Sequence, residues 1–363
     1  MATLRRDYRE IVPAFRHRHQ PDHPAMVALR NKPRDVTMTI DAGFQYRVSD
    51  IVAAYARKSA GRAAAVVLDA DTGDVLASAS YPWPEASDGE AAGDVADAFL
   101  DRARYGLYPP GSTFKLVTAS AALRQDPSLT QTTFACVRLP DGRAGAKLSG
   151  WQRPIRDDVL DVHPHGTINM HDGMVHSCNA YFGQLAVTLG AKPLVETAGR
   201  LGISLTPSQN AIRRIADTLP QIGYGQADVV TTPLRMARVA AAAASNGVLR
   251  ETRWDGSAAP AKTEIFLQPD AARILTGFMR EVVLTGTGHR LRDHPWRIAG
   301  KTGTAELSGR PSHSWFVGFA PYGTAVKRIA FAIIVENAGY GGASAAPAAG
   351  EIVTAAAAAG LIK

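Results

Sequence analysis

The sequence has little of what cross-links a chain or anchors it in a membrane. Its 363 residues include two cysteines, Cys136 and Cys178, which excludes a disulfide framework, and no Cys-x-x-Cys pair is present. No apolar run reaches the roughly 20 residues that a membrane helix needs. The first 20 residues are basic and lack the apolar stretch of a secretory signal. These features alone leave the cellular compartment open.

Charge is also sparse. Charged residues make up 20% of the chain, the net charge is +7, and no run of five like charges occurs. Nucleic-acid-binding surfaces usually show clustered lysine and arginine, so we do not expect nucleic acid as a partner. Hydrophobic residues make up 46%, which excludes a disordered chain and is enough for one large domain or two modest ones.

The first part of the chain is expected to contain a linker, a helix and a pair of strands. Residues 1–34 are rich in Arg, His and Pro without clear periodicity, and we interpret them as an N-terminal extension or linker, with regular structure beginning after them. Asp41 is placed to cap a helix that should end near Gly61. The β-rich runs on either side of residues 71–73 then indicate a hairpin.

The middle of the chain has a helical pattern and the end returns to strands. The clearest helix, 233–246, has Thr232 as its cap and Pro233 in its first position. After residue 295 the period changes to three strands, and the alanine-rich helix 347–360 closes the chain.

We therefore predict an α+β fold, with a mainly antiparallel five-stranded sheet flanked by helices and an all-helical subdomain inserted. The sheet part should comprise about 35–110 and 265–363, and the helical part about 111–264, together forming one domain over 35–363. A crevice is expected where the insert meets the sheet.

A first chemical motif pairs Ser112 with Lys115 after the chain-breaking run Pro109-Pro110-Gly111. Residues three apart on a helix share a face, so the lysine amine can reach the serine hydroxyl. A serine becomes a nucleophile when a base takes its proton, and an amine is such a base if burial or nearby positive charge lowers its pKa. Taken alone, the motif is better explained by an ordinary helix start.

A second motif, Ser177-Cys178-Asn179, lies between two helical stretches. Its hydroxyl can relay a proton and its amide can bind a peptide carbonyl or steady a lysine. Ser208 and Asn210 fit the same spacing, but they lie in a predicted loop without helical context, so we set them aside.

A third motif, Lys301-Thr302-Gly303-Thr304, falls within a strand pattern. Small and hydroxylated residues there suit a ligand lying along the strand, and Gly303 permits a close backbone approach. Lys301 offers a positive charge to a substrate carboxylate and can depress the pKa of Lys115. The simpler explanation is an edge strand kept soluble by lysine and threonine.

Together the three motifs are far more specific, because they occur in the order known for β-lactamases and penicillin-binding proteins. From about residue 35 to 363 the chain resembles the transpeptidase domain of the class B penicillin-binding proteins. The stretches that carry the resemblance include YPPGSTFK, HGTINMHDGMVHSCNAYF, IAGKTGTAE and HSWFVGFAP. The resemblance implies a β-lactamase/transpeptidase-like fold and a peptidoglycan D,D-transpeptidase that needs no cofactor.

The resemblance also implies roles for single residues. Ser112 would be acylated by a stem peptide ending in D-Ala-D-Ala, or by a β-lactam that mimics it, with Lys115 as base and Ser177 as proton relay. Asn179 would contact a substrate amide and Lys115.

The third motif would bind the substrate. Lys301, Thr302 and Thr304 would hold the terminal carboxylate, with Gly303 between them. The backbone N–H groups of Ser112 and Thr304 would form the oxyanion hole.

For the cell, the resemblance implies the outer (periplasmic) face of the bacterial cytoplasmic membrane and a membrane glycosyltransferase as a partner. The membrane helix and pedestal domain usual in the family are not found in these residues. The role in division or elongation, the stem-peptide diamine and the oligomeric state are not indicated.

Two other functions stay open. A D,D-carboxypeptidase or serine β-lactamase would use the same acyl-enzyme, but the Glu-x-x-x-Asn loop of class A β-lactamases does not occur here. A non-catalytic β-lactam sensor would be expected to lack some of the catalytic residues, all of which are present.

The remaining polar residues suggest no second chemistry. A group of histidines, His163, His165, His171 and His176, lacks the His-x-x-x-His spacing typical of zinc sites, so we expect no metal. Cys178 is interpreted as a packing residue, and reduced thiols are expected rather than a Cys136–Cys178 disulfide.

Overall fold

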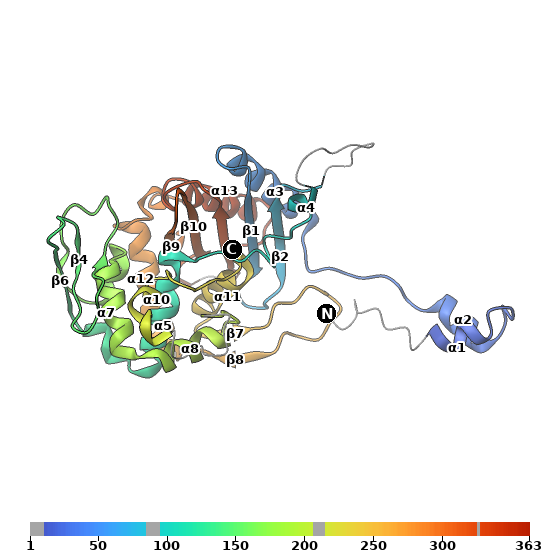
Figure 1. Ribbon diagram of the computed structural model, residues 1–363. Coiled ribbons are helices and arrows are strands. Elements are labelled where there is room, and N and C mark those ends of the chain that lie inside the picture. The colour runs from blue at the N-terminus through green and yellow to red at the C-terminus, as the bar shows by residue number, and fades with distance from the viewer. Residues whose placement is uncertain (1–10, 85–94, 206–214, 325–326) are drawn as a thin grey trace.

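The centre of the fold is an antiparallel five-stranded sheet in the order β2-β1-β11-β10-β9. Its strands are β1 (Ala63–Asp69), β2 (Val75–Tyr81), β9 (Ala299–Leu307), β10 (Arg310–Ala320) and β11 (Ile329–Val335). Because β1 pairs with β11, both ends of the chain meet in one sheet, which confirms the predicted fold class (Figure 1). This computed structural model describes residues 11–84, 95–205, 215–324 and 327–363.

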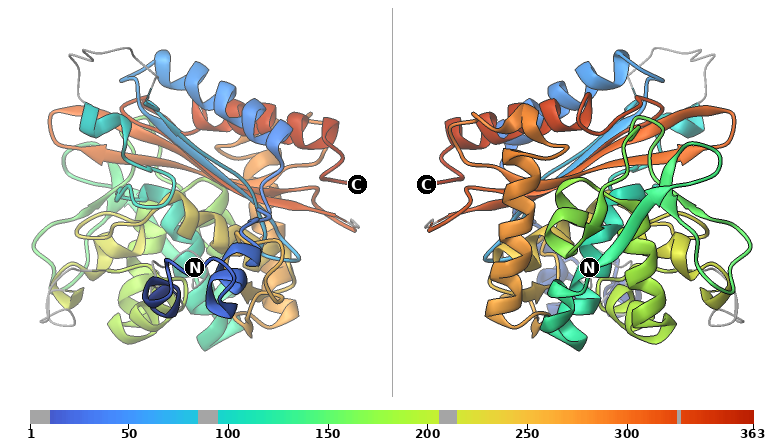
Figure 2. Two further views of the ribbon diagram at one scale, coloured as in Figure 1. Left: turned by 90° about the vertical axis from the view of Figure 1, so that its right-hand side faces the viewer. Right: turned by 90° about the vertical axis from the view of Figure 1, so that its left-hand side faces the viewer.

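The two faces of the sheet pack against different partners. Successive side chains of a strand point to opposite faces, so Val66 lies in the core shared with the helical part and Val67 in the core beneath two terminal helices. These helices are α3 (Ala42–Arg57) and α13 (Ala345–Ala358), and they lie side by side over that face (Figure 2). With both faces covered, every residue of β11 is buried.

Helices make up most of the regular structure described in the inserted part. They are η2 (Gly111–Phe114), α5 (Lys115–Gln125), η3 (Pro127–Gln131), α6 (Met170–Val175), α7 (Asn179–Leu189), α8 (Ala191–Arg200), α10 (Leu219–Gly223) and α11 (Pro233–Ala244). After the insert come α12 (Pro269–Leu284) and η4 (His289–Leu291). α11 packs against the face of the sheet opposite α3 and α13, and so joins the insert to the sheet.

The prediction that the insert is all-helical is wrong. It also contains a four-stranded sheet in the order β5-β4-β3-β6 and a separate two-stranded pair, β7 with β8. The strands are β3 (Phe134–Arg138), β4 (Ala144–Ala146), β5 (Ile155–Arg156), β6 (Gly166–Ile168), β7 (Val248–Arg250) and β8 (Thr263–Ile265). Strands of two to five residues are too short to show a period of two, which explains why they could not be recognised in the sequence.

The predicted helix caps are confirmed. The Asp41 carboxylate accepts a hydrogen bond from the Phe44 N–H at 2.8 Å, and the Thr232 hydroxyl accepts one from the Arg235 N–H at 3.3 Å. Such caps satisfy backbone donors that have no partner within the helix. Over the described ranges, no helix is long and apolar enough to cross a membrane.

Regular structure begins earlier than predicted. Two short helices, α1 (Ile11–Arg16) and α2 (Pro24–Asn31), precede the domain and lie apart from it (Figure 1). Helices of six and eight residues are too short to show a clear period, which is why the sequence suggested only a linker. A third short helix, α4 (Val95–Ala98), lies beyond β2.

Candidate active site

Ser112 stands where a tight backbone turn runs into α5. It is partly exposed, while the residues that follow it up to Leu123 are buried. Gly111 before it has a φ of 53°, and a Cβ there would lie 2.6 Å from the Thr304 carbonyl oxygen. Only glycine tolerates both constraints. The sequence thus brings the segment of Gly111 and Ser112 against β9 and leaves the Ser112 hydroxyl partly exposed.

Lys115 lies directly beneath Ser112 and is fully buried, with 0% exposure. Its Nζ donates to Ser112 Oγ at 3.0 Å, to Asn179 Oδ1 at 2.7 Å and to Ser177 Oγ at 3.2 Å, and it also contacts the Ser177 carbonyl oxygen. Burial lowers the pKa of Lys115 to about 8, although the nearby Asp157 carboxylate opposes this shift. A neutral amine at this place can accept the Ser112 proton.

Ser177 is held between α6 and α7 in an unusual backbone conformation. Its φ is 58°, in the left-handed region that residues with a Cβ seldom adopt. The following residue, Cys178, caps α7, since its sulfur accepts from the Tyr181 N–H at 3.3 Å. The turn places Ser177 Oγ within hydrogen-bond reach of both Lys115 and Lys301, the second at 2.8 Å. The hydroxyl can therefore carry a proton between two amines.

Asn179 is fixed on two sides. Its Nδ2 donates to the Arg156 carbonyl oxygen at 3.0 Å, and its backbone N–H donates to the Asp157 carboxylate. Its Oδ1, facing Lys115, is left as the acceptor. This orientation lets the amide hold the lysine close to Ser112.

Lys301 is also fully buried, on β9, which is an edge strand of the sheet. Besides Ser177, its Nζ contacts the Thr302 carbonyl oxygen at 3.1 Å. Burial, and next the charge of Lys115, lower the pKa of Lys301 well below the usual range. The side chain points to Ser177, and does not stand free in the cleft as a charged anchor would.

Thr302, Gly303 and Thr304 continue the wall of the site. Thr302 Oγ1 lies 2.5 Å from Thr287 Oγ1. A Cβ on Gly303 would lie 2.7 Å from Thr113 Cγ2, so this glycine is needed for packing β9 against η2. The close approach that Gly303 permits is therefore to the protein's own Thr113 side chain.

The motifs meet at one cleft of about 700 Å³. Residues from all three line it, and these are Ser112, Ser177, Asn179, Thr302 and Thr304. Lys115 and Lys301 lie in the floor beneath it. The cleft is where the insert meets the sheet, as predicted. Ser208 and Asn210, which share the spacing of the second motif, lie outside the described residues.

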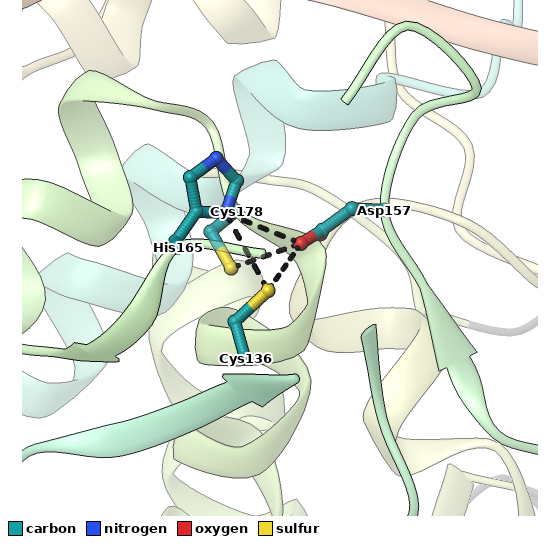
Figure 3. Close-up of side chains that lie close together, drawn as sticks. All are labelled: Cys136, Asp157, His165 and Cys178. Atoms are coloured by element: carbon teal, nitrogen blue, oxygen red, sulfur yellow. Dashed lines mark hydrogen bonds and ion pairs between the residues drawn. The ribbon is translucent and has the colours of Figure 1, made fainter. Parts of the chain in front are cut away.

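One cluster beside the cleft was not predicted. Cys136, Asp157, His165 and Cys178 come together next to the Ser177 turn, and their donor atoms could hold a metal ion (Figure 3). Both cysteines are free and buried, as expected. Burial raises the pKa of Asp157, but hydrogen bonds from His165 and Cys136 hold it below its usual range.

Of the four histidines considered from the sequence, one belongs to this cluster. His176 stacks on the His165 ring at a centroid distance of 5.2 Å, and His171 is paired with Asp172 at 2.8 Å. Asp157 carried no sequence signal, because neither a motif nor a fixed spacing marks it.

The fold and site define a class of enzyme: a serine acyltransferase with a buried lysine three residues after the serine. The comparison with protein families agrees with this. Residues 63–354 match the family described as Penicillin binding protein transpeptidase domain, and the chain therefore belongs to that family.

Curated relatives are found in several bacteria. The chain is 31% identical over 339 residues to the peptidoglycan D,D-transpeptidase PbpA of Mycobacterium tuberculosis, covering 81% of this chain and 67% of PbpA. It is 26% identical over 368 residues to the peptidoglycan D,D-transpeptidase MrdA of Escherichia coli, covering 85% of this chain and 55% of MrdA. The chain thus spans about two thirds of one relative and about half of the other.

Solved structures show the same fold. The crystal structure of PBPA from M. tuberculosis aligns with a TM-score of 0.75 at 26% identity, covering 91% of this chain and 84% of that one. Its penicillin G acyl-enzyme complex aligns with a TM-score of 0.74 at 26% identity, covering 89% and 80%. That relative therefore forms a covalent adduct with a β-lactam.

Proposed function

We propose that this chain is the catalytic part of a peptidoglycan D,D-transpeptidase that cross-links stem peptides through an acyl-enzyme on Ser112. The observation that carries the proposal is the position of Lys115 Nζ, buried and within 3.2 Å of Ser112 Oγ, Asn179 Oδ1 and Ser177 Oγ. An ordinary helix start would leave that lysine in water. The names of the curated relatives support the same activity.

The first half-reaction is acylation. Neutral Lys115 takes the proton of Ser112 Oγ, which bonds to the carbonyl carbon of the penultimate D-Ala. The C–N bond to the last D-Ala breaks, and its nitrogen receives the proton from Lys115 through Ser177. The backbone N–H groups of Ser112 and Thr304 stabilise the oxyanion.

The second half-reaction reverses these roles. The amine of a neighbouring stem peptide attacks the ester carbonyl and forms the cross-linking C–N bond. The Ser112 Oγ–carbon bond breaks, and the proton of the amine returns to Ser112 by way of Lys115. In the first half-reaction, before the last D-Ala leaves, its terminal carboxylate is bound by Thr302 and Thr304, while buried Lys301 keeps Ser177 oriented.

The partners and the place of action follow from the same proposal. β-Lactams acylate Ser112 because they mimic the D-Ala-D-Ala end. A homologue with 25% identity and a TM-score of 0.72 is described in a peptidoglycan synthase complex that coordinates polymerization and crosslinking. This supports a membrane glycosyltransferase as partner, with action on the outer face of the cytoplasmic membrane.

Labelling with fluorescent penicillin tests the assignment. Wild-type protein should carry one covalent label per chain, and Ser112→Ala should carry none. A matched control is Ser120→Ala, which removes a buried hydroxyl from α5 that donates to the Leu116 carbonyl oxygen at 2.7 Å. Equal labelling of Ser112→Ala and wild type would refute the proposal.

The lifetime of the label separates cross-linking from hydrolysis. A transpeptidase is expected to keep the penicilloyl group for many minutes, because the Glu-x-x-x-Asn loop that activates the deacylating water in class A β-lactamases does not occur in the sequence. Turnover of a chromogenic cephalosporin within seconds would instead identify a β-lactamase.

A further inference from the structure

A second cavity lies beside α12 and has a volume of about 540 Å³. Of the described residues, none lines both this cavity and the cleft that holds Ser112. Its wall is formed by α6, by the turns of α12 from Arg273 to Leu284, by Arg297 before β9 and by Tyr322 after β10. α12 itself packs next to β9 (Figure 1). The proposed reaction uses none of the residues of this second cavity.

The cavity is lined by three arginines, Arg273, Arg280 and Arg297. Arg280 is 9% exposed, and its Nη1 donates to the Ile298 carbonyl oxygen at 2.7 Å. Burial, and next the charge of Arg297, lower the pKa of Arg280, although Glu281 opposes this shift. Because a buried arginine usually has a carboxylate partner, the surroundings of Arg280 are unusual.

The acidic groups around the cavity do not neutralise these charges. Asp270 pairs with Arg273 at 3.1 Å, but both side chains are well exposed, so water screens the pair. Glu281 is the only acid among the described residues of the wall. Within the part of the chain that the structure describes, no carboxylate lies at ion-pair distance from Arg280 or Arg297. Two guanidinium groups at one cavity therefore lack an anionic partner.

Arg297 is held at the cavity by a strained backbone. Its φ is 41°, in the left-handed region that residues with a Cβ seldom adopt. Its carbonyl oxygen accepts from the Tyr322 N–H at 2.8 Å, and its guanidinium carbon lies 5.6 Å from the centre of the Tyr322 ring. Strain of this kind is concentrated at sites that bind ligands.

The remainder of the wall is largely apolar. Ile274, Phe278 and Leu284 line it from α12, and each is half-buried. On the α6 side, the His171 ring meets the Phe278 ring edge to face at a centroid distance of 5.5 Å. A ligand with an apolar portion would remove these side chains from water.

One residue keeps the cavity open. Gly277 lies inside α12, where glycine is less favourable than alanine by about 1 kcal/mol. A Cβ at this position would have no atom within 4 Å, so close packing does not require a glycine here. Because Gly277 lines the cavity, its missing side chain leaves room for a bound molecule.

We propose that this cavity binds a phosphate group carried by a molecule with an apolar portion. A phosphate bears up to two negative charges and can accept hydrogen bonds from Arg280 and Arg297 together, since planar guanidinium groups match its oxygens. Ile274, Phe278 and Leu284 would cover the apolar portion. The inference does not rest on the proposed transpeptidase activity.

Calorimetric titration of the whole chain with hexyl phosphate is the direct test. Hexyl phosphate should bind at one site, at least about tenfold more tightly than inorganic phosphate, because its alkyl chain is buried. It should also bind at least about tenfold more tightly than heptanoate, which carries one charge. Absence of saturable binding, or equal affinity for heptanoate, would overturn the proposal.

Substitutions locate the ligand. Gly277→Met should fill the cavity and weaken hexyl phosphate binding at least about tenfold without changing a charge, and Arg297→Ala should weaken it by a similar factor. Gly277→Ala is the control for the first variant, because one methyl group leaves most of the cavity open. Arg200→Ala is the control for the second, because Arg200 is exposed and paired with Glu264. Full affinity in Gly277→Met, or equal losses in Arg200→Ala and Arg297→Ala, would contradict the assignment.

Two further measurements define the ligand's place and source. Acylation of Ser112 by penicillin should leave hexyl phosphate affinity unchanged, and loss of binding would place the ligand in the cleft and refute the proposal. Vesicles of phosphatidylcholine with phosphatidic acid separate a lipid phosphate from a soluble ester. Retention of wild type but not of Gly277→Met would support a lipid, and hexyl phosphate binding without retention would support a soluble ester.

Discussion

The lowered pKa of Lys115 predicts an unusual pH profile for acylation. Burial lowers this pKa to about 8, while an exposed lysine titrates near 10.5. At pH 7 the neutral fraction is then about 9% rather than about 0.03%, a gain of roughly 300-fold in available base. The rate constant for acylation of Ser112 by penicillin should follow this neutral fraction.

The plateau is the decisive part of the profile. With a pKa of about 8, the rate rises about fiftyfold from pH 6 to 8 but only about twofold from pH 8 to 9.5. With an unshifted lysine it would rise roughly thirtyfold over the second interval. Stopped-flow measurement with a fluorescent penicillin distinguishes the two, with spontaneous β-lactam hydrolysis measured in parallel. A rate that still climbs steeply above pH 9 would refute the buried-base argument.

One substitution should shift the pH profile of acylation to lower pH. The Asp161 carboxylate, which lines the cleft, raises the pKa of Lys115. Asp161→Asn should therefore shift the midpoint to lower pH. Asp141→Asn is a suitable control, because Asp141 is exposed and paired with Arg156. Identical shifts in both variants would show that the charge effect is not specific.

Two further predictions concern the framework. Gly225→Ala should reduce acylation at least tenfold, because a Cβ there would lie 2.1 Å from the Gly111 carbonyl oxygen and displace the nucleophile turn; an unchanged rate would contradict this packing. Glu336→Ala should cost about 3 kcal/mol in urea unfolding, because it leaves buried Arg102 (1% exposed) without one of its carboxylate partners. Glu196→Ala, in an exposed pair, should change stability by less than about 0.5 kcal/mol, and equal losses would count against the argument.

Part of the site could be predicted because the residues that form it are close together in the sequence. Ser112 and Lys115 need only one helical turn to meet, and a chain-breaking run marks where that turn begins. The meeting of these residues with Ser177 and Lys301 is not local. Their order along the chain matched a known pattern, and the structure shows all four within one chain of hydrogen bonds.

The cluster of four potential metal ligands beside the Ser177 turn could not be predicted, because its residues are not linked by any local pattern. Cys136, Asp157, His165 and Cys178 are spaced irregularly, and their convergence depends on short strands that have no readable period. The role of Gly303 was also hidden, since the side chain of Thr113 that needs the space comes from another element. Contacts of this kind are set by tertiary packing alone.

The pairing of β1 with β11 has a consequence for how the chain folds during its synthesis. During synthesis the Ser112 segment is complete long before β9, β10 and β11 exist, and the sheet cannot close until the last of them arrives. Such long-range pairing is slow to form. A nascent chain therefore carries Ser112 without Lys301 or Thr304 opposite it. Covalent labelling by penicillin should mark only chains that have finished folding, which makes the drug a reporter of maturation.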